Sequence, residues 1–184
     1  MSLARLAATS EKYTVADITR MAEAGVFSPE DNFELIEGEI VPMSPKYHAH
    51  ESIKSVIGMA MSKACPENLR VGFETSIFLS KTTIIEPDLC LYPANIHTDE
   101  LTGPDLLIAI EVAATTLAYD RGRKAQIYAR YGVRELWVID AIKRHTFVYS
   151  APSATGWGWT IENGPEYELS IYALPSFKHR LGNI

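Results

Sequence analysis

The sequence predicts an α/β fold in which helices flank a mixed β-sheet. Residues 105–113, "DLLIAIEVA", form a nearly continuous apolar run of strand length, typical of a central strand covered on both faces. A helical segment from Asp120 and a strand from Glu135 follow, and a strand, helix and strand of this length make a right-handed parallel crossover. The earlier strands have the pattern of antiparallel pairs, so we expect both kinds of pairing in one sheet.

A helix and a β-hairpin precede this sheet. Thr14 and Asp17 make a capping signature, and apolar residues then recur at helical spacing, which predicts a helix over residues 15–24. The segment "NFELIEGEIVPMSP" alternates, turns at Glu37 and Gly38, alternates again and ends on prolines. This pattern predicts an N-terminal β-hairpin.

The middle of the chain predicts one long helix and a pair of strands. From His50 to Ala64, apolar residues recur at steps of three and four, which indicates an amphipathic helix. The segments "LRVGFETSIFLS" and "IIEPDLCLYP" are interpreted as two antiparallel strands, the second of them containing Pro87. The tail "GWGWTIENGPEYELSIYALPSF" predicts one further hairpin or edge segment.

Length and composition predict a single domain over residues 1–184, since one domain takes roughly 150 residues. The two cysteines, Cys65 and Cys90, have no pairing pattern and no CxxC, which argues against a secreted disulfide framework and a thiolate zinc site. Arg5 interrupts the first apolar run, and no stretch approaches the roughly 18 apolar residues of a membrane span. We therefore expect a cytoplasmic protein without a membrane partner.

The net charge of -6 argues against a protein that coats nucleic acid by global attraction. The charge is unevenly distributed, however. Residues 121–144 contain seven basic side chains against only Glu135 and Asp140. Two interpretations stay open: a solvated helix face followed by a charged turn, or a local patch that faces phosphate groups.

Two acidic residues stand where the chain should be buried. Asp88 follows Pro87 at the start of a strand, and Glu111 lies inside the most apolar strand. A buried carboxylate needs a cation, strong hydrogen bonds or a raised pKa, because burying an unpaired charge is costly. Ala109 and Ala113 share the face of Glu111 and leave space around it. An ordinary aliphatic core would not have this pattern.

Lys124 is the basic residue best placed to meet these acids. Lys124, Tyr128 and Tyr131 recur at i, i+4 and i+7, so they form one helix face, and a helix returning over the sheet would bring this face toward Glu111. Two acids and a lysine around one cavity suit phosphodiester hydrolysis. The carboxylates hold Mg²⁺, the metal activates water, and the lysine stabilises charge on the phosphate.

The ordered set of motifs resembles a known family. "FELIEGEIVPMSP" at 33–45, "EPD" at 86–88, "IEV" at 110–112 and "DRGRKAQIYARYGVRELWVID" at 120–140 are similar to the Uma-two type of restriction-endonuclease-like proteins, in the PD-(D/E)XK nuclease superfamily. The resemblance covers residues 13 to about 150. It implies a restriction-endonuclease-like core with the order αβββαβ, Mg²⁺ or Mn²⁺ as cofactor, DNA as substrate and a homodimer.

The resemblance also assigns residues. Asp88 matches the first acid of the superfamily motif and Glu111 the second, and both are metal ligands in active members. The motif's lysine would fall at position 113, where this chain has Ala113. The resemblance implies that the lysine has moved to the following helix, which points to Lys124.

Three further residues are weaker candidates. Glu34 in "FELIEG" matches a family acid at the metal site, and Asp120 matches another recurrent position, for which we favour the role of a helix cap. His50 and His48 have a spacing that could chelate a metal, but two histidines without a third ligand are a weak signal. A polar helix start is the favoured interpretation of this pair.

Two function classes stay open. A metal-dependent deoxyribonuclease is favoured by the acids, Lys124 and the basic segment. A catalytically inactive dimeric module for binding or assembly is favoured by the net acidity and Ala113, and in it Glu111 would form only a structural salt bridge and Asp88 only a turn. A paired-carboxylate glycosidase is disfavoured because no sugar-binding platform accompanies the acids. The aromatic residues near the end are expected to pack in the core or an interface: Trp157, Trp159, Tyr167 and Tyr172.

Overall fold

The computed structural model describes residues 3–9, 11–44 and 47–184, and its largest element is a six-stranded sheet. The strand order is β10-β9-β8-β7-β6-β3, in which β7 and β8 are parallel and the other neighbours are antiparallel. The predicted mixed sheet is therefore confirmed. Its strands are β3 (Leu69–Phe73), β6 (Leu89–Pro93), β7 (Ile108–Ala113), β8 (Glu135–Asp140), β9 (His145–Ser153) and β10 (Gly156–Asn163).

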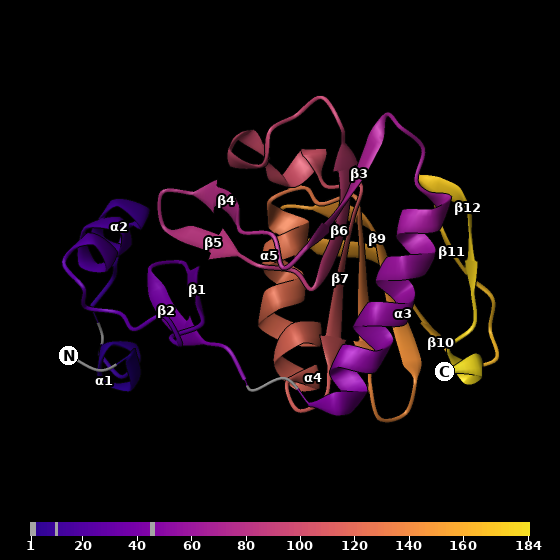
Figure 1. Ribbon diagram of the computed structural model, residues 1–184, viewed down its shortest axis with the longest axis horizontal. Coiled ribbons are helices and arrows are strands. Elements are labelled where there is room, and N and C mark those ends of the chain that lie inside the picture. Colours follow the sequence, from indigo (N-terminus) through magenta and orange to yellow (C-terminus); the bar gives the residue numbers. More distant parts are fainter. Residues whose placement is uncertain (1–2, 10, 45–46) are drawn as a thin grey trace.

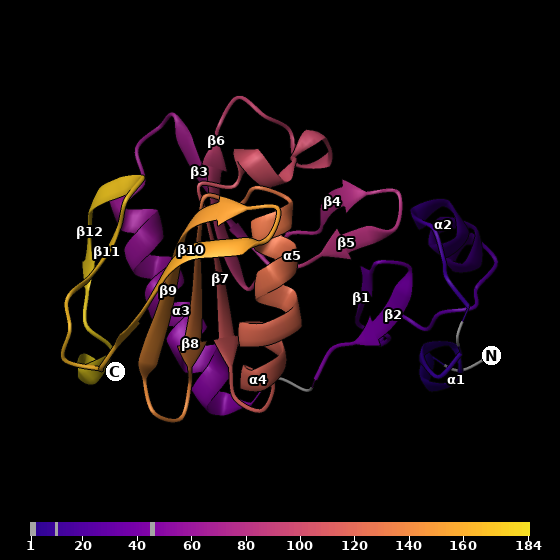
Figure 2. The ribbon, with the colours of Figure 1, turned by 180° about the vertical axis from the view of Figure 1, so that it is seen from behind.

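Helices cover both faces of this large sheet (Figures 1 and 2). On one face, α3 (His48–Ala64) packs its apolar side on β6, β7 and β8, and the hairpin of β11 (Leu169–Ile171) and β12 (Leu174–His179) packs beside it. On the other face lies a continuous helical segment made of α4 (Leu117–Tyr119), a π-helical turn (Asp120–Lys124) and α5 (Ala125–Arg130). The face of β7 that carries Glu111 looks toward this second layer.

A second sheet of four strands forms a lobe at one side of the molecule (Figure 1). Its strand order is β2-β1-β5-β4, and the helices α1 and α2 pack beside it. We call residues 3–42 and 77–85, as far as they are described, the small-sheet lobe. Its elements are α1 (Leu3–Ala7), α2 (Val15–Glu23), β1 (Phe33–Ile36), β2 (Glu39–Pro42), β4 (Ile77–Ser80) and β5 (Thr83–Ile85).

The predicted N-terminal helix and hairpin are both present. Thr14 and Asp17 form the expected capping box at the start of α2. Glu37 and Gly38 have φ values of 53° and 83°, the left-handed pair that a tight turn between twisted antiparallel strands requires. Pro45, which ends the predicted hairpin segment, lies outside the described residues.

The prediction of one long strand over "LRVGFETSIFLS" was wrong. The chain leaves the large sheet after β3, turns at Glu74 with a φ of 46°, and enters the small sheet as β4. Pro87 is not inside a strand but between β5 and β6, where its missing N–H disturbs no ladder. The order α3-β3-β6-β7-α5-β8 is the expected αβββαβ core, with the pair β4-β5 inserted between its first two strands.

The C-terminal segment also differs from the expectation of one hairpin. β10 extends the large sheet by pairing with β9, and β11 and β12 form a separate hairpin. Trp157 is half-buried. The side chains of Trp159, Tyr167 and Tyr172 are exposed, so they do not pack in the core, and their packing in an interface stays a prediction. Short 3₁₀ turns occur at Thr98–Glu100, Gly103–Asp105 and Leu181–Asn183. Within the described ranges, no helix is both long and apolar enough to cross a membrane.

Candidate active site

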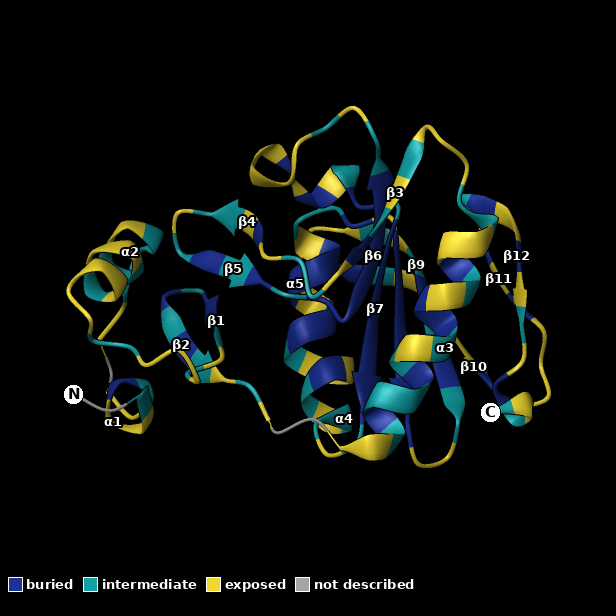
Figure 3. Ribbon diagram, viewed as in Figure 1, coloured by how far each residue is buried: buried dark blue, intermediate teal, exposed yellow. Residues whose placement is uncertain are grey.

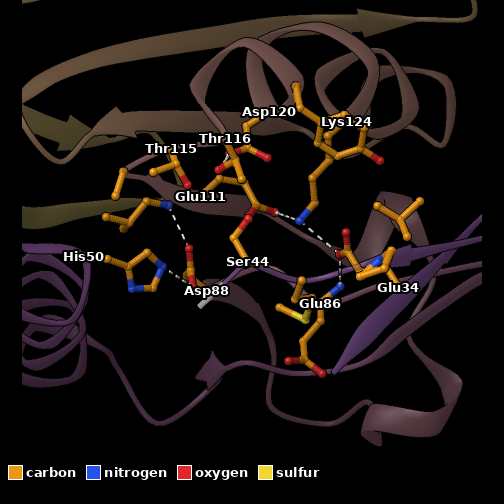
Figure 4. A pocket seen from close by; sticks show the side chains of 16 residues that line it. Glu34, Ser44, His50, Glu86, Asp88, Glu111, Thr115, Thr116, Asp120 and Lys124 are labelled. Carbon is orange, nitrogen blue, oxygen red and sulfur yellow. Dashed lines mark hydrogen bonds and ion pairs between the residues drawn. The ribbon is translucent and has the colours of Figure 1, made fainter. Parts of the chain in front are cut away.

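A cavity of about 200 Å³ lies where the small-sheet lobe meets the large sheet (Figure 4). Six of the residues proposed from the sequence for chemistry line it, although they come from five separate elements or their ends; His48 does not. The six are Glu34 on β1, His50 on α3, Asp88 just before β6, Glu111 on β7, and Asp120 and Lys124 on the π-helical turn.

Asp88 is held by two donors. Its Oδ2 accepts a hydrogen bond from the backbone N–H of Val112 at 2.8 Å, and its Oδ1 lies 3.0 Å from Nε2 of His50. Nδ1 of His50 lies 3.1 Å from Oε1 of Glu51. Burial opposes the charged form of His50, but the hydrogen bonds and charges of Asp88 and Glu51 outweigh it and raise the histidine pKa. His50 therefore holds Asp88 through Nε2, and its raised pKa favours the charged ring, whereas His48 is exposed.

Glu111 is buried in the middle of the large sheet, on the same face as Ala109 and Ala113. Its Oε1 lies 2.9 Å from Nζ of Lys124 and also accepts a hydrogen bond from the hydroxyl of Tyr128. Burial raises the pKa of Glu111 well above its usual range; Lys124 opposes this rise, and the carboxylates around the cavity add to it.

Lys124 joins the two sheets. Its Nζ lies 3.0 Å from Oε1 of Glu34 as well as 2.9 Å from Glu111, and the lysine is only 4% exposed. The same Oε1 of Glu34 accepts the backbone N–H of Glu86 at 2.7 Å. Although burial lowers the pKa of Lys124, the nearby carboxylates more than offset this effect and hold the pKa well above its ordinary value. The side chain is thus a buried, charged ammonium group.

The π-helical turn places Asp120 and Lys124 in the cavity. The N–H of Ala125 donates to the carbonyl of Asp120, five residues earlier, which widens the helix by one residue at this turn. Such single π-turns are frequent at functional sites. The expectation that Asp120 caps the helix was wrong, because the helix starts at Leu117 and Thr116 is its N-cap. Asp120 is instead buried and accepts a hydrogen bond from the Thr116 hydroxyl.

The cavity contains more acids than bases. Five carboxylates line it, and the basic side chains along it are Lys124 and His50. Burial raises the pKa of Asp120, as it does that of Glu111, so the acids are crowded and only partly neutralised. Carboxylate oxygens with water are the ligands that Mg²⁺ prefers, so this donor set fits a divalent cation. The five acids are Glu34, Glu86, Asp88, Glu111 and Asp120.

The arrangement is not that of a closed metal site. In the described part of the chain, no three His, Cys, Asp or Glu side chains are grouped so that they could surround one ion. Asp88 is turned toward His50, and Glu111 toward Lys124 and Tyr128. An ion bound here would be held by one or two carboxylates and by water, which is the common manner for Mg²⁺.

Two tyrosines were missed as site residues. Tyr128 was placed on the helix face of Lys124 but was given no role, and its ring is fully buried with the hydroxyl on Glu111. Tyr119 lines the cavity, and its hydroxyl is buried with no hydrogen-bond partner among the described residues. Burial is the main cause that raises the pKa of Tyr119 to about 12. Ordinary helical spacing from Lys124 does not indicate Tyr119, which lies five residues earlier. The wide π-helical turn between them brings both side chains to the cavity.

The basic segment 121–144 is not a free patch along the helix. Arg123 pairs with Glu37 and Glu39 at the tip of the hairpin, and Arg130 pairs with Glu37. The guanidinium of Arg121 lies 3.5 Å above the ring of Phe147. Arg123 and Arg130, two of the cations that the sequence suggested for phosphate binding, are therefore already paired with acids of the small-sheet lobe.

Comparison with known proteins agrees with the fold and the motifs. The family model described as "Uma2: Putative restriction endonuclease" matches residues 15–178. No curated protein matches the chain. Among solved structures, a "putative nuclease belonging to DUF820" from Anabaena variabilis has a TM-score of 0.75 and 16% sequence identity, covering 93% of this chain and 96% of that one. This likeness shows a shared fold, the restriction-endonuclease-like core. Because the family model spans most of its length, this chain belongs to the Uma2 restriction-endonuclease family.

Proposed function

We propose that this protein is a metal-dependent endonuclease that hydrolyses phosphodiester bonds of DNA. The observation that supports it best is the meeting of Asp88, Glu111 and Lys124 at one cavity, in a chain of this family (Figure 4). Asp88 and Glu111 would hold Mg²⁺ or Mn²⁺, with Glu34 as a further acid of the site. When bound, such an ion lowers the pKa of a water molecule and offsets charge on the phosphate.

Lys124 is the residue we assign to the phosphate. Its ammonium group is charged, buried and aimed into the cavity, where the effective dielectric is low and a fixed charge acts strongly. Nζ is held between Oε1 of Glu111 and Oε1 of Glu34 at 2.9 and 3.0 Å. Its position is therefore set before substrate arrives, and it can stabilise the negative charge that develops on the phosphate oxygens in the pentacoordinate transition state or on the attacking water.

The remaining polar contacts orient the acids. The backbone N–H of Val112 and the His50 ring hold the two oxygens of Asp88. Asp88 precedes β6 and Glu111 lies on β7, and these strands pair through Leu89 and Ile110. The spacing of the two carboxylates thus follows from the register of the large sheet.

A second candidate function is a catalytically inactive module that binds or assembles as a homodimer. Two observations favour it: the carboxylates of Asp88 and Glu111 are already bound to side chains, and Arg123 and Arg130 are paired with acids of the hairpin. In this case Lys124, Glu111 and Glu34 would form only a structural bridge. The homodimer and the single domain over residues 1–184 are proposals in either case.

Cleavage assays separate the two functions. We expect purified protein with Mg²⁺ or Mn²⁺ to nick supercoiled DNA or to cut single-stranded DNA, and chelation by EDTA to stop the reaction. Glu111→Gln and Lys124→Met should each lower the rate by about 100-fold or more, the range of lost electrostatic stabilisation. Lys143→Met is the matched control, because Lys143 is exposed and does not line the cavity.

The outcomes are distinct. Equal cleavage by the wild type and both site variants would mean that a contaminant acts, and the assignment would fail. If no form cleaves any DNA with either metal, the inactive module remains. Sedimentation of the same samples reports the oligomeric state.

A further inference from the structure

Tyr128 is a buried polar residue to which the proposed mechanism gives no task. It lies on α5, four residues after Lys124, and its side chain has no exposed surface. The ring packs in the core between the large sheet and the lobe, with Ile36, Leu136 and Val138 among the members of the same cluster. Phenylalanine would fill that place equally well, so the hydroxyl needs its own explanation.

The hydroxyl of Tyr128 donates its hydrogen bond to Oε1 of Glu111. Nζ of Lys124 lies 2.9 Å from the same oxygen. Two donors from successive turns of one helix thus converge on one carboxylate oxygen. Within the described residues, neither a hydrogen bond nor an ion pair reaches Oε2 of Glu111, and Glu111 lines the cavity.

This asymmetry has a mechanical consequence. A carboxylate with one partner can rotate and present either oxygen, whereas two donors on Oε1 fix both its plane and the oxygen that remains for a ligand. The orientation of a metal-binding carboxylate by hydrogen bonds behind it commonly accounts for about 10- to 100-fold in metal affinity or activity.

We infer that Tyr128 is a positioning residue of the site, which holds Glu111 through Oε1 so that Oε2 stays available to a divalent cation. The inference rests on the proposed function, because it takes Glu111 as a metal ligand. Tyr128 itself touches neither the metal nor the substrate.

The substitution Tyr128→Phe removes only the oxygen and keeps the ring in the core. We expect Mn²⁺ affinity, measured by calorimetry on the intact chain, to fall by about tenfold or more. The cleavage rate at saturating metal should fall while KM for DNA stays unchanged, since DNA contacts are not altered. Tyr131→Phe is the matched control, because Tyr131 ends the same helix, is half-buried and does not line the cavity.

A measurement on the wild-type chain covers the case in which the variant does not fold. A hydroxyl proton that is buried and bound to a carboxylate exchanges slowly, so it should give a downfield proton resonance. This resonance should shift when Mg²⁺ is added, because the ion draws charge from the carboxylate that Tyr128 holds. A resonance that is indifferent to Mg²⁺ at concentrations that saturate the site contradicts the inference.

Failure of this inference differs from failure of the proposed function. If the wild type binds Mn²⁺ and cleaves DNA, and Tyr128→Phe does both equally well, only the positioning role is overturned. If the wild type neither binds Mn²⁺ nor cleaves DNA, the proposed function falls and the role of Tyr128 falls with it. Loss of metal affinity in Tyr128→Phe, with Tyr131→Phe unchanged, supports both.

Discussion

The large sheet and the small-sheet lobe both contribute acids to the cavity, but they hold them in different ways. Asp88 and Glu111 belong to the large sheet, whose strands β7 and β8 are buried along their whole length (Figure 3). Glu34 belongs to the lobe, whose own core is small: among its described residues, Leu6, Leu35 and Ile40 form the buried cluster, and half-buried side chains surround them.

The lobe is joined to the rest of the molecule by two kinds of contact. Ile36, Ile77 and Ile85 reach into the core of the large sheet. Polar contacts among the described residues add to these: the buried bridge from Lys124 to Glu34, the hydrogen bond from the backbone N–H of Glu86 to Glu34, and the exposed pairs of Arg123 and Arg130 with the hairpin tip. Strand register therefore sets the positions of Asp88 and Glu111 relative to each other. Glu34 reaches the cavity from the other sheet and is held there by Lys124 and by the backbone N–H of Glu86.

Removal of the lysine at this junction is expected to have the largest effect. Lys124→Met leaves Glu34 and Glu111 buried without their cation, and breaking one partner of a buried pair costs about 3–5 kcal/mol in the free energy of unfolding. Urea unfolding monitored by circular dichroism measures this change. The double variant with Glu111→Gln should recover part of the loss, since one uncompensated charge is removed. A loss below about 1 kcal/mol in the single variant would mean that Lys124 does not join the two regions.

The next prediction concerns the helix that lies between the regions. Tyr119→Phe should raise the free energy of unfolding by about 1 kcal/mol, because a buried hydroxyl without a partner costs about that much or more. Tyr128→Phe removes the same atom but breaks a hydrogen bond to Glu111, so we expect it to lower stability. Thermal melts of the two variants provide the comparison. Equal destabilisation by both would show that the Tyr119 hydroxyl has a partner in solution.

The two regions also differ in how well the sequence predicts them. Alternation along β7 placed Glu111 on one face with Ala109 and Ala113, and this pattern is local, so it is readable without the structure. The pairing of β1 with β5 joins residues about fifty positions apart, and no local pattern encodes it. For this reason the segment "LRVGFETSIFLS" was interpreted as one strand, although it contains both β3 and β4.

The candidate site was also predictable only where a local pattern or the family resemblance indicated its residues. Asp88 and Glu111 stood out because acids in apolar strands are unusual, and the family resemblance then pointed to Lys124 and Glu34. Tyr119 escaped because helical spacing assumes 3.6 residues per turn, which the π-helical turn breaks. The pairing of Arg123 with Glu39 also escaped, because it depends on how the lobe is placed against the helix.

The smallest effect on stability is expected at the exposed edge of the junction. Glu37→Gln and Glu39→Gln together remove the acids that pair with Arg123 and Arg130, and exposed ion pairs contribute only about 0–1 kcal/mol each.

The consequence of this double variant for DNA binding should be larger, because both arginines become available to phosphate. We expect tighter binding at low salt, and a salt dependence of the binding constant that is steeper by about 0.9 for each arginine that gains a phosphate contact. Fluorescence anisotropy with labelled DNA over a salt series measures both. Glu23→Gln and Glu30→Gln together provide a control with the same loss of two charges, because both glutamates are exposed and neither lines the cavity. If this control tightens binding as much as the hairpin variant does, the gain comes from net charge, and the hairpin acids do not compete with DNA for the helix.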